Sequence, residues 1–271
     1  KLRHAALGIP SGKGLFTPLH DALRDGKQII SVTKLLRHTF RDWRILLRLA
    51  VQNPKHVKQL VARRPQFIGE CDACGYGLGG VWISGPYIKN PIVWRLELPD
   101  DIIEMFNNGE ITISDLEMAA HLLHFMVLEY IAPLAFLSVG IFSNNTPTVA
   151  WATRLSSKSM LAGRLLRALS VRQYIAKSSP VVTAHIQGIH NIRADNASRW
   201  FNNHHNHKDK KLSNNDFLPF FNSSHTMQKQ SWEEFNLSSA LSSKMINELR
   251  GKPFTLCLLY TSPSPRDSSE S

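Results

Sequence analysis

The chain has 271 residues, of which 43% are hydrophobic, so it can bury a core of ordinary size. Its 32 Lys and Arg residues outnumber 21 Asp and Glu residues, and the net charge of +11 favours polyanionic partners, nucleic acid first. The longest apolar run, residues 130–142, is too short to cross a bilayer, so we expect no membrane partner. Three cysteines do not make a disulfide framework, which indicates a reducing intracellular compartment, cytoplasmic or nuclear.

The charges are distributed unevenly along the chain. Residues 27–64 contain ten Lys and Arg residues and a single acid, Asp42, whereas residues 96–117 contain seven acids and no Lys or Arg. The first region suits phosphate groups, and the second suits divalent cations.

The two ends of the chain differ from its middle. Because residue 1 is Lys rather than Met, we expect the chain to be a piece of a longer protein. Residues 258–271 are rich in Ser and Pro and resemble a translated library linker. Residues 202–248 are rich in Asn, Ser and His. We therefore expect residues 202–271 to form a flexible, largely disordered extension with at most a short helix at residues 239–249.

The first strong periodicity predicts a basic amphipathic helix. Its apolar positions recur with helical spacing, and they are Phe40, Trp43, Leu46, Leu47, Ala50 and Val51. Its basic positions recur on another face, and they are Lys34, Arg37, Arg41, Arg44 and Arg48. The basic face could follow a phosphate backbone, and an ordinary solvated helix surface is an equally open interpretation.

The residues that follow alternate between strand and helix patterns. Strands are predicted at residues 67–73, 81–83, 92–98, 134–143 and 181–186, with a glycine-rich turn at residues 75–80. Helices are predicted at residues 114–130, 146–155, 157–177 and 194–200. Ser114 is the expected N-cap of the first of these, with Glu117 at capping-box spacing. This order predicts an α/β domain with a five-stranded mixed sheet flanked by helices.

An ordered set of polar residues in this region resembles a known family. Asp72 lies on the first strand, Glu117 on the first long helix, Asn144-Asn145-Thr146 after the fourth strand, and Ala194-Asp195 opens the last helix. The set resembles the ribonuclease H domain of retrotransposon reverse transcriptases, most closely those of Gypsy-like and DIRS-like elements. The resemblance covers residues 66–201. Residues 1–65 are similar to the thumb and connection segment that precedes the nuclease, so an upstream polymerase domain is an expected partner.

The resemblance implies a two-metal nuclease that hydrolyses the RNA strand of an RNA–DNA hybrid. Such chemistry uses two divalent cations, one to activate water and one to stabilise the leaving oxygen, and hard cations need carboxylate ligands. By resemblance, Asp72 would bridge two Mg²⁺ ions, with Mn²⁺ as a possible substitute, while Glu117 and Asp195 would each support one of them.

Each of these acids also has an interpretation without metal. Asp72 could be an acid at an edge-strand turn, Glu117 could complete a capping box, and Asp195 could cap the last helix. Glu117, His121 and His124 share a helical face that could hold zinc, although their apolar neighbours favour a packed helix.

Asn144 departs from the family pattern, which has Asp at this position. An amide contributes no charge to a cation site, so we expect a nuclease by descent whose activity is severely reduced. Two other functions stay open, a non-catalytic module that binds nucleic acid and a structural connection piece.

Several further residues are candidates for substrate contact. Asn145 and the loop amides near Gly75 could read the RNA strand, and His190 could assist proton handling or product release. Basic residues on the long helix could hold phosphates, and they are Arg164, Arg167 and Arg172.

Overall fold

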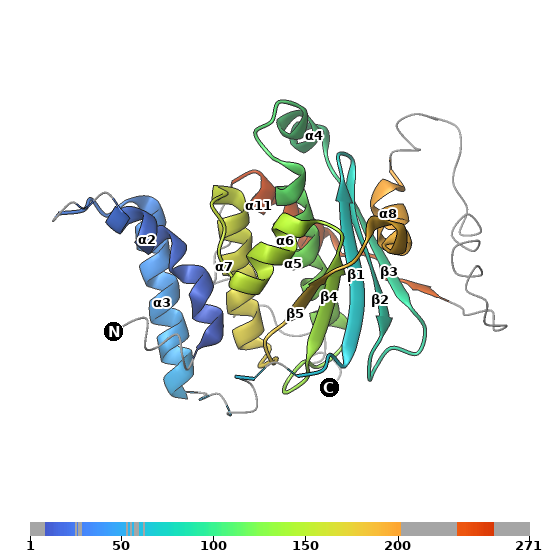
Figure 1. Ribbon diagram of the computed structural model, residues 1–271, viewed down its shortest axis with the longest axis horizontal. Helices are drawn as coiled ribbons and strands as arrows, with labels where there is room; N and C mark the ends of the chain where they lie inside the picture. The colour runs from blue at the N-terminus through green and yellow to red at the C-terminus, as the bar shows by residue number, and fades with distance from the viewer. Residues whose placement is uncertain are drawn as a thin grey trace.

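The computed structural model describes residues 9–24, 26, 29–52, 54, 56, 60–61, 63–201 and 232–251. Its centre is a six-stranded mixed sheet with strand order β5-β4-β1-β2-β3-β6 (Figure 1). The strands are β1 (Phe67–Cys74), β2 (Gly77–Ser84), β3 (Ile92–Glu97), β4 (Val139–Ser143), β5 (Val182–His185) and β6 (Glu233–Glu234).

The strand directions divide the sheet into two parts. β1, β2 and β3 form an antiparallel meander, whereas β4 and β5 add to the other side of β1 as parallel strands. Parallel strands end at the same edge of a sheet. One edge of the sheet therefore carries Asp72, near the end of β1, and Ser143, the last residue of β4. Asn144 directly follows β4 at this edge.

Helices cover both faces of the sheet. α5 (Ile113–Ile131) packs on β1 and β2, and α7 (Met160–Ile175) packs on α5, whereas α8 (Ile192–Arg199) covers β1, β2 and β3 from the opposite face (Figure 1). Adjacent glycines on β2 permit this close packing. A Cβ atom on Gly79 would lie 2.3 Å from the backbone nitrogen of Ser198, and one on Gly80 would lie 2.7 Å from Nδ1 of His124.

The remaining helices surround this central unit. They are η1 (Pro10–Leu15), α2 (Thr17–Arg24), α3 (Lys34–Gln52), α4 (Asp100–Asn107), α6 (Thr146–Arg154), η3 (Gly188–His190) and α11 (Ser239–Leu249). α2 and α4 have no counterpart among the helices predicted from the sequence. No helix among the described residues combines the length and apolarity that a membrane crossing needs.

The N-terminal helices pack on α7. Leu15 from η1, together with Trp43 and Leu46 from α3, forms a small buried cluster with Val171 and Tyr174 of α7. The helix predicted from the basic periodicity is therefore confirmed as α3, and its apolar side faces the rest of the fold. Phe40 and Val51 are exceptions to the predicted apolar face, because they are 48% and 83% exposed. The predicted boundary at residue 65 stays a prediction.

Residues 232–251 correct two expectations. β6 pairs in parallel with β3, so the sheet has six strands rather than five. α11 has the predicted bounds, and its side chains Leu241, Met245 and Leu249 are buried in the main hydrophobic core. This part of the predicted extension is thus packed structure, because its apolar residues recur with helical spacing and cover α5 and α7. Residues 202–231 and 252–271 lie outside the described residues.

The N-terminus of α5 differs from the prediction in a way that matters for the site. Thr112, not Ser114, is the N-cap, and its side chain accepts from the backbone N–H of Asp115 while the Asp115 carboxylate accepts from the backbone N–H of Thr112. The capping box therefore uses Asp115 instead of Glu117. Glu117 lies one turn into the helix and needs another explanation.

The structure of the glycine-rich segment also differs from the prediction. Gly77, Gly79 and Gly80 lie within β2, so the turn between β1 and β2 is confined to residues 75–76. Strand β4 begins at Val139, five residues later than predicted, and Phe136 before it adopts a left-handed φ of 65°.

Candidate functional site

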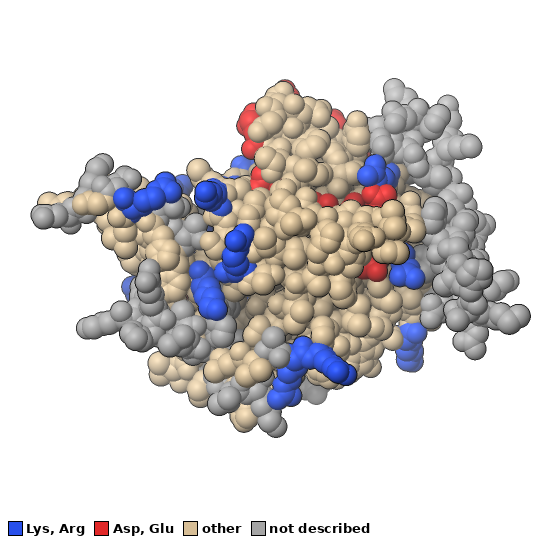
Figure 2. Space-filling view, in the orientation of Figure 1, with Lys and Arg blue, Asp and Glu red and all other residues tan. Residues whose placement is uncertain are grey.

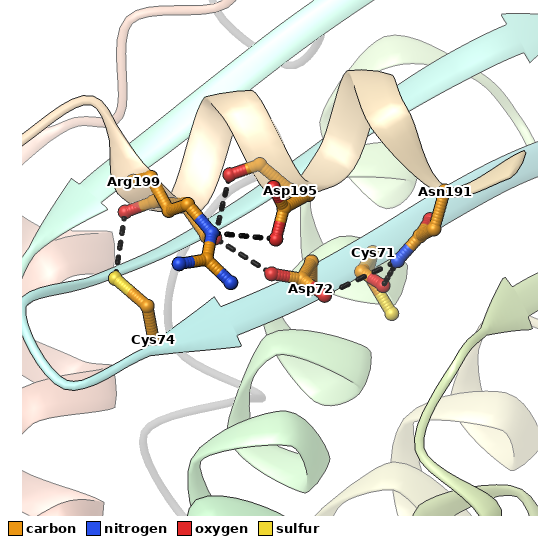
Figure 3. A network of polar contacts seen from close by, with 7 residues as sticks. Cys71, Asp72, Cys74, Asn191, Asp195 and Arg199 are labelled. Carbon is orange, nitrogen blue, oxygen red and sulfur yellow. Dashed lines mark hydrogen bonds and ion pairs between the residues drawn. The ribbon is translucent and has the colours of Figure 1, made fainter. Parts of the chain in front are cut away.

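The candidate site is centred on Asp72, a buried carboxylate on β1 beneath α8 (Figure 3). Ser198 donates a hydrogen bond from Oγ to Oδ2 of Asp72 at 2.7 Å. Asn191 donates from Nδ2 to Oδ1 of Asp72 at 3.2 Å and to the backbone oxygen of Cys71 at 3.3 Å. Both oxygens of the Asp72 side chain are therefore oriented by donors from one helix.

α8 supplies these donors because of its periodicity. Asn191 is its N-cap, and Asp195 and Ser198 follow at four and seven residues, so the three side chains lie on one face above β1. Asp195 is partly exposed and pairs with Arg199, whose Nε lies 2.6 Å from Oδ1 of Asp195. Burial raises the pKa of the Asp72 carboxyl, and the negative charge of Asp195 adds to this effect.

Glu117 reaches the same region from α5, on the other face of the sheet. The backbone N–H of Ala73 donates to its carboxylate, and Ser143 Oγ donates to Oε2 at 3.4 Å. Burial and the neighbouring charge of Asp72 raise the pKa of Glu117 to about 9. Burial likewise raises the pKa of Asp72 to about 6, against the lowering effect of the hydrogen bond from Ser198.

Asn144 follows β4 and completes the cluster. Its side chain hydrogen-bonds to Asp72 and lowers the pKa of that carboxyl. Its backbone oxygen lies 3.2 Å from Nε2 of His185, and its Nδ2 would lie 3.6 Å from a Cβ atom placed on Gly188. The amide thus stands beside the central acid, as the sequence order predicted.

The structure brings the four predicted residues together from β1, α5, α8 and the segment after β4. Their donor atoms are hard oxygens. Burial raises the pKa values of Asp72 and Glu117, and so does repulsion, from Asp195 on Asp72 and from Asp72 on Glu117; a cation at the site would offset this repulsion. Within the described residues, no three His, Cys, Asp or Glu side chains are placed to hold one ion together. The residues present fit ions that take one or two carboxylates each and complete their shell with water and substrate phosphate, which is the habit of Mg²⁺.

The structure corrects the assignment of three arginines to phosphate binding. Arg167 is buried, and its Nε lies 3.0 Å from Oδ2 of Asp42 in an ion pair that joins α7 to α3. Arg172 is buried and paired with Glu129. Arg164 donates to the backbone oxygens of Glu248 and Gly251, so it anchors α11. These guanidinium groups stabilise the fold, because the long helix is buried on most of its circumference.

The predicted basic face of α3 is exposed. Arg37, Arg41, Arg44 and Arg48 all lie on the surface, and Figure 2 shows Lys and Arg side chains over the end of the molecule formed by α2 and α3. On the same face of the molecule, the acidic side chains gather toward α4 and α8. Phosphate binding by α3 stays a prediction.

Three further candidates from the sequence lie on separate segments of the protein. Asn145 is the N-cap of α6, where its Oδ1 accepts from the backbone N–H of Thr148 at 2.9 Å. Gly75 lies in the β1–β2 turn, where a Cβ atom would meet the ring of Phe106 at 2.9 Å. His190 is exposed at the end of η3, directly before Asn191. Their contacts with nucleic acid stay predictions.

Asn191 and Ser198 are not among the predicted site residues, although the sequence contains a signal for both. Positions 191, 195 and 198 have the spacing of one helical face, and this face already contained Asp195. A helix predicted to start at residue 194 excluded Asn191 from that pattern.

Comparison with solved structures gives a distant similarity. RNase H1 from the halophilic archaeon Halobacterium salinarum NRC-1 superposes with a TM-score of 0.33 and 14% sequence identity, over 48% of this chain and 92% of that chain. No family model matches the chain. No curated protein matches it either.

Proposed function

We propose that the chain contains a ribonuclease H-like unit that acts on the RNA strand of RNA–DNA hybrids and derives from a retroelement polyprotein. The observation that carries the proposal is the convergence of Asp72, Glu117 and Asp195 from three separate elements, with Asn144 hydrogen-bonded to the central acid. Simple capping roles do not account for this convergence, because Thr112 and Asp115 cap α5.

In this proposal the residues have distinct tasks. Asp72, oriented by Ser198 and Asn191, would be the central ligand for the Mg²⁺ ions, with Glu117 and Asp195 as further ligands. When bound, the ions supply water activation and leaving-group stabilisation. Asn144 offers an amide where a fourth carboxylate would strengthen the site, so we expect weak hydrolysis.

The experiment that tests the proposal is the substitution Asn144→Asp. With Mg²⁺ and a labelled RNA–DNA hybrid, Asn144→Asp should increase RNA cleavage by roughly 10²-fold, the scale of one electrostatic catalytic group. The double variant Asp72→Asn/Asn144→Asp is the matched control and should lose the gain. A folded Asn144→Asp protein that binds hybrid and cleaves no faster than the parent would contradict the nuclease assignment.

A second function is favoured by the exposed arginines of α3. If the carboxylate cluster does not catalyse hydrolysis, the chain would act as a nucleic-acid-binding module. Its affinity for hybrid should then fall steeply as the salt concentration rises. A gel-shift with uncleaved hybrid separates this module from a purely structural connection piece, which would bind nothing.

A further inference from the structure

One surface outside the carboxylate cluster has the composition of a binding site. An open hollow of about 640 Å³ lies along α3, and it is lined by Arg37, Phe40, Arg41, Arg44, Ile45 and Arg48. The arginines follow one another at four, three and four residues, so they form a row of roughly 16 Å along the helix. α3 lies at one end of the molecule, and α8 with the carboxylate cluster lies toward the other (Figure 1).

The aromatic residue in this hollow is unusual for its surroundings. Phe40 is 48% exposed, whereas Trp43 and Leu46 on the same helix are buried. A single exposed apolar side chain is common on protein surfaces. An exposed ring set among four guanidinium groups is a different case, because it combines a stacking surface with a concentration of positive charge.

Acidic residues are scarce in the segment that forms this surface. Asp42 is the single acid between residues 27 and 64, and it is buried in the ion pair with Arg167. Within the described part of the chain, Arg37, Arg44 and Arg48 form no ion pair. The pKa of His38 on the same helix is lowered by burial and then by Arg167, Lys34 and Arg41, which agrees with a positive field on this side.

We propose that the hollow on α3 binds single-stranded nucleic acid, with phosphates on Arg37, Arg44 and Arg48 and one unpaired base stacked on Phe40. The ring is the reason for choosing a single strand. In a duplex the faces of the bases are covered by their neighbours, so a duplex offers phosphates to the arginines but no base face to Phe40. The site would hold an unpaired strand away from the carboxylate cluster.

The test compares single-stranded and duplex ligands. Fluorescence anisotropy of the full chain in EDTA, which prevents metal-dependent cleavage, would measure binding of labelled oligouridine and of a blunt RNA–DNA hybrid. Phe40→Ala should weaken oligouridine binding by about 5- to 150-fold and leave hybrid binding almost unchanged. Phe40→Trp should retain binding. Val51→Ala is the matched control, because Val51 is an exposed apolar residue of α3 outside the hollow.

Salt dependence separates the stacking contribution from the phosphate contribution. Phe40→Ala should leave the slope of log K against log salt unchanged, whereas Arg44→Ala should reduce it by about 0.7 for single strands. Three results would overturn the proposal, provided circular dichroism shows folded protein: no binding of oligouridine by the parent, equal binding by Phe40→Ala, or an equal loss of hybrid binding. None of them bears on cleavage by Asn144→Asp.

Discussion

The hydroxyl of Ser198 donates to Oδ2 of Asp72 across 2.7 Å, and both groups are buried between α8 and β1. The carboxylate at the centre of the cluster therefore depends on the helix above it for its orientation. Its pKa of about 6 means that it is mostly ionised at pH 8 and mostly protonated at pH 5. The Ser198 hydrogen bond should therefore stabilise the fold more at pH 8 than at pH 5.

Ser198→Ala should destabilise the fold more at pH 8 than at pH 5. An ionised buried oxygen that loses its donor costs about 1–3 kcal/mol, whereas a protonated carboxyl depends less on that donor. Urea denaturation at both pH values would measure the difference, with the exposed Ser243→Ala in α11 as control. An equal cost at the two pH values would show that the hydroxyl does not act on the carboxylate.

Glu117 should make the metal-free protein less stable as the pH rises. Its pKa is raised from 4.5 to about 9 in the folded state, so between these values the folded protein keeps a proton that the unfolded chain has lost. The stabilisation is full below pH 4.5 and is lost on approaching pH 9, by up to about 1.4 kcal/mol per pH unit.

Glu117→Gln isolates this effect. In EDTA, the difference in unfolding free energy between pH 6 and pH 8 should be smaller for Glu117→Gln than for the parent, and the exposed Glu110→Gln should behave as the parent does. Adding Mg²⁺ at pH 8 should raise the stability of the parent and not of Glu117→Gln. If the two variants have the same pH dependence, Glu117 is ionised in the fold.

His121 and His124 should respond in opposite ways to replacement by Leu. Both rings are fully buried in α5, and neither nitrogen of His121 has a hydrogen-bond partner among the described residues. His124 accepts from Nε1 of Trp94 at 2.7 Å and stacks on Trp82 with ring centroids 3.9 Å apart. His121→Leu should preserve or raise stability at pH 7, whereas His124→Leu leaves a buried donor unpaired and should cost about 1–3 kcal/mol.

The acid response supplies an independent measurement for His121. Burial lowers the pKa of His121 to about 4, below its unfolded value of 6.5. The unfolded chain therefore gains a proton first, and stability falls as the pH drops from 6.5 toward 4. His121→Leu should reduce this loss between pH 7 and pH 5, and an unchanged loss would mean that the ring is solvated.

Arg167→Met should destabilise the packing of α3 against α7. It leaves the buried Asp42 carboxylate without its partner, which costs about 3–5 kcal/mol when the charge remains. The double variant Asp42→Leu/Arg167→Met should recover most of the loss, because no charge is then buried. Thermal denaturation of the parent and the two variants would measure these changes in stability. An Arg167→Met protein as stable as the parent would contradict a structural role for Arg167.

The order of the central elements was predictable because each has a simple periodicity. β1 is flanked by turn residues, and α5 and α7 have long apolar patterns, so their existence followed from the sequence. β6 has two exposed acidic residues, Glu233 and Glu234, and no strand signal of its own. It forms because β3 offers a free edge, which is a tertiary effect.

The same distinction applies to the site. Asp72, Glu117, Asn144 and Asp195 were found from their order in the chain, and the structure places them together. The errors arose where burial decides the role of a side chain. The sequence pattern predicts Arg167 as a basic surface residue, and only the packing of α3 on α7 shows that it pairs with Asp42. In the sequence, Ser198 is an ordinary helix residue. Only the position of α8 over β1 brings its hydroxyl within hydrogen-bond distance of the Asp72 carboxylate.

The packing of α11 sets the minimum length of a recombinant fragment. Protein expressed to residue 201 would lack the helix that covers α5 and α7, and it would leave the outer edge of β3 without β6. The apolar groove left behind and the open strand edge would both promote self-association during purification. An expression plasmid for biochemical work should therefore extend at least to Gly251.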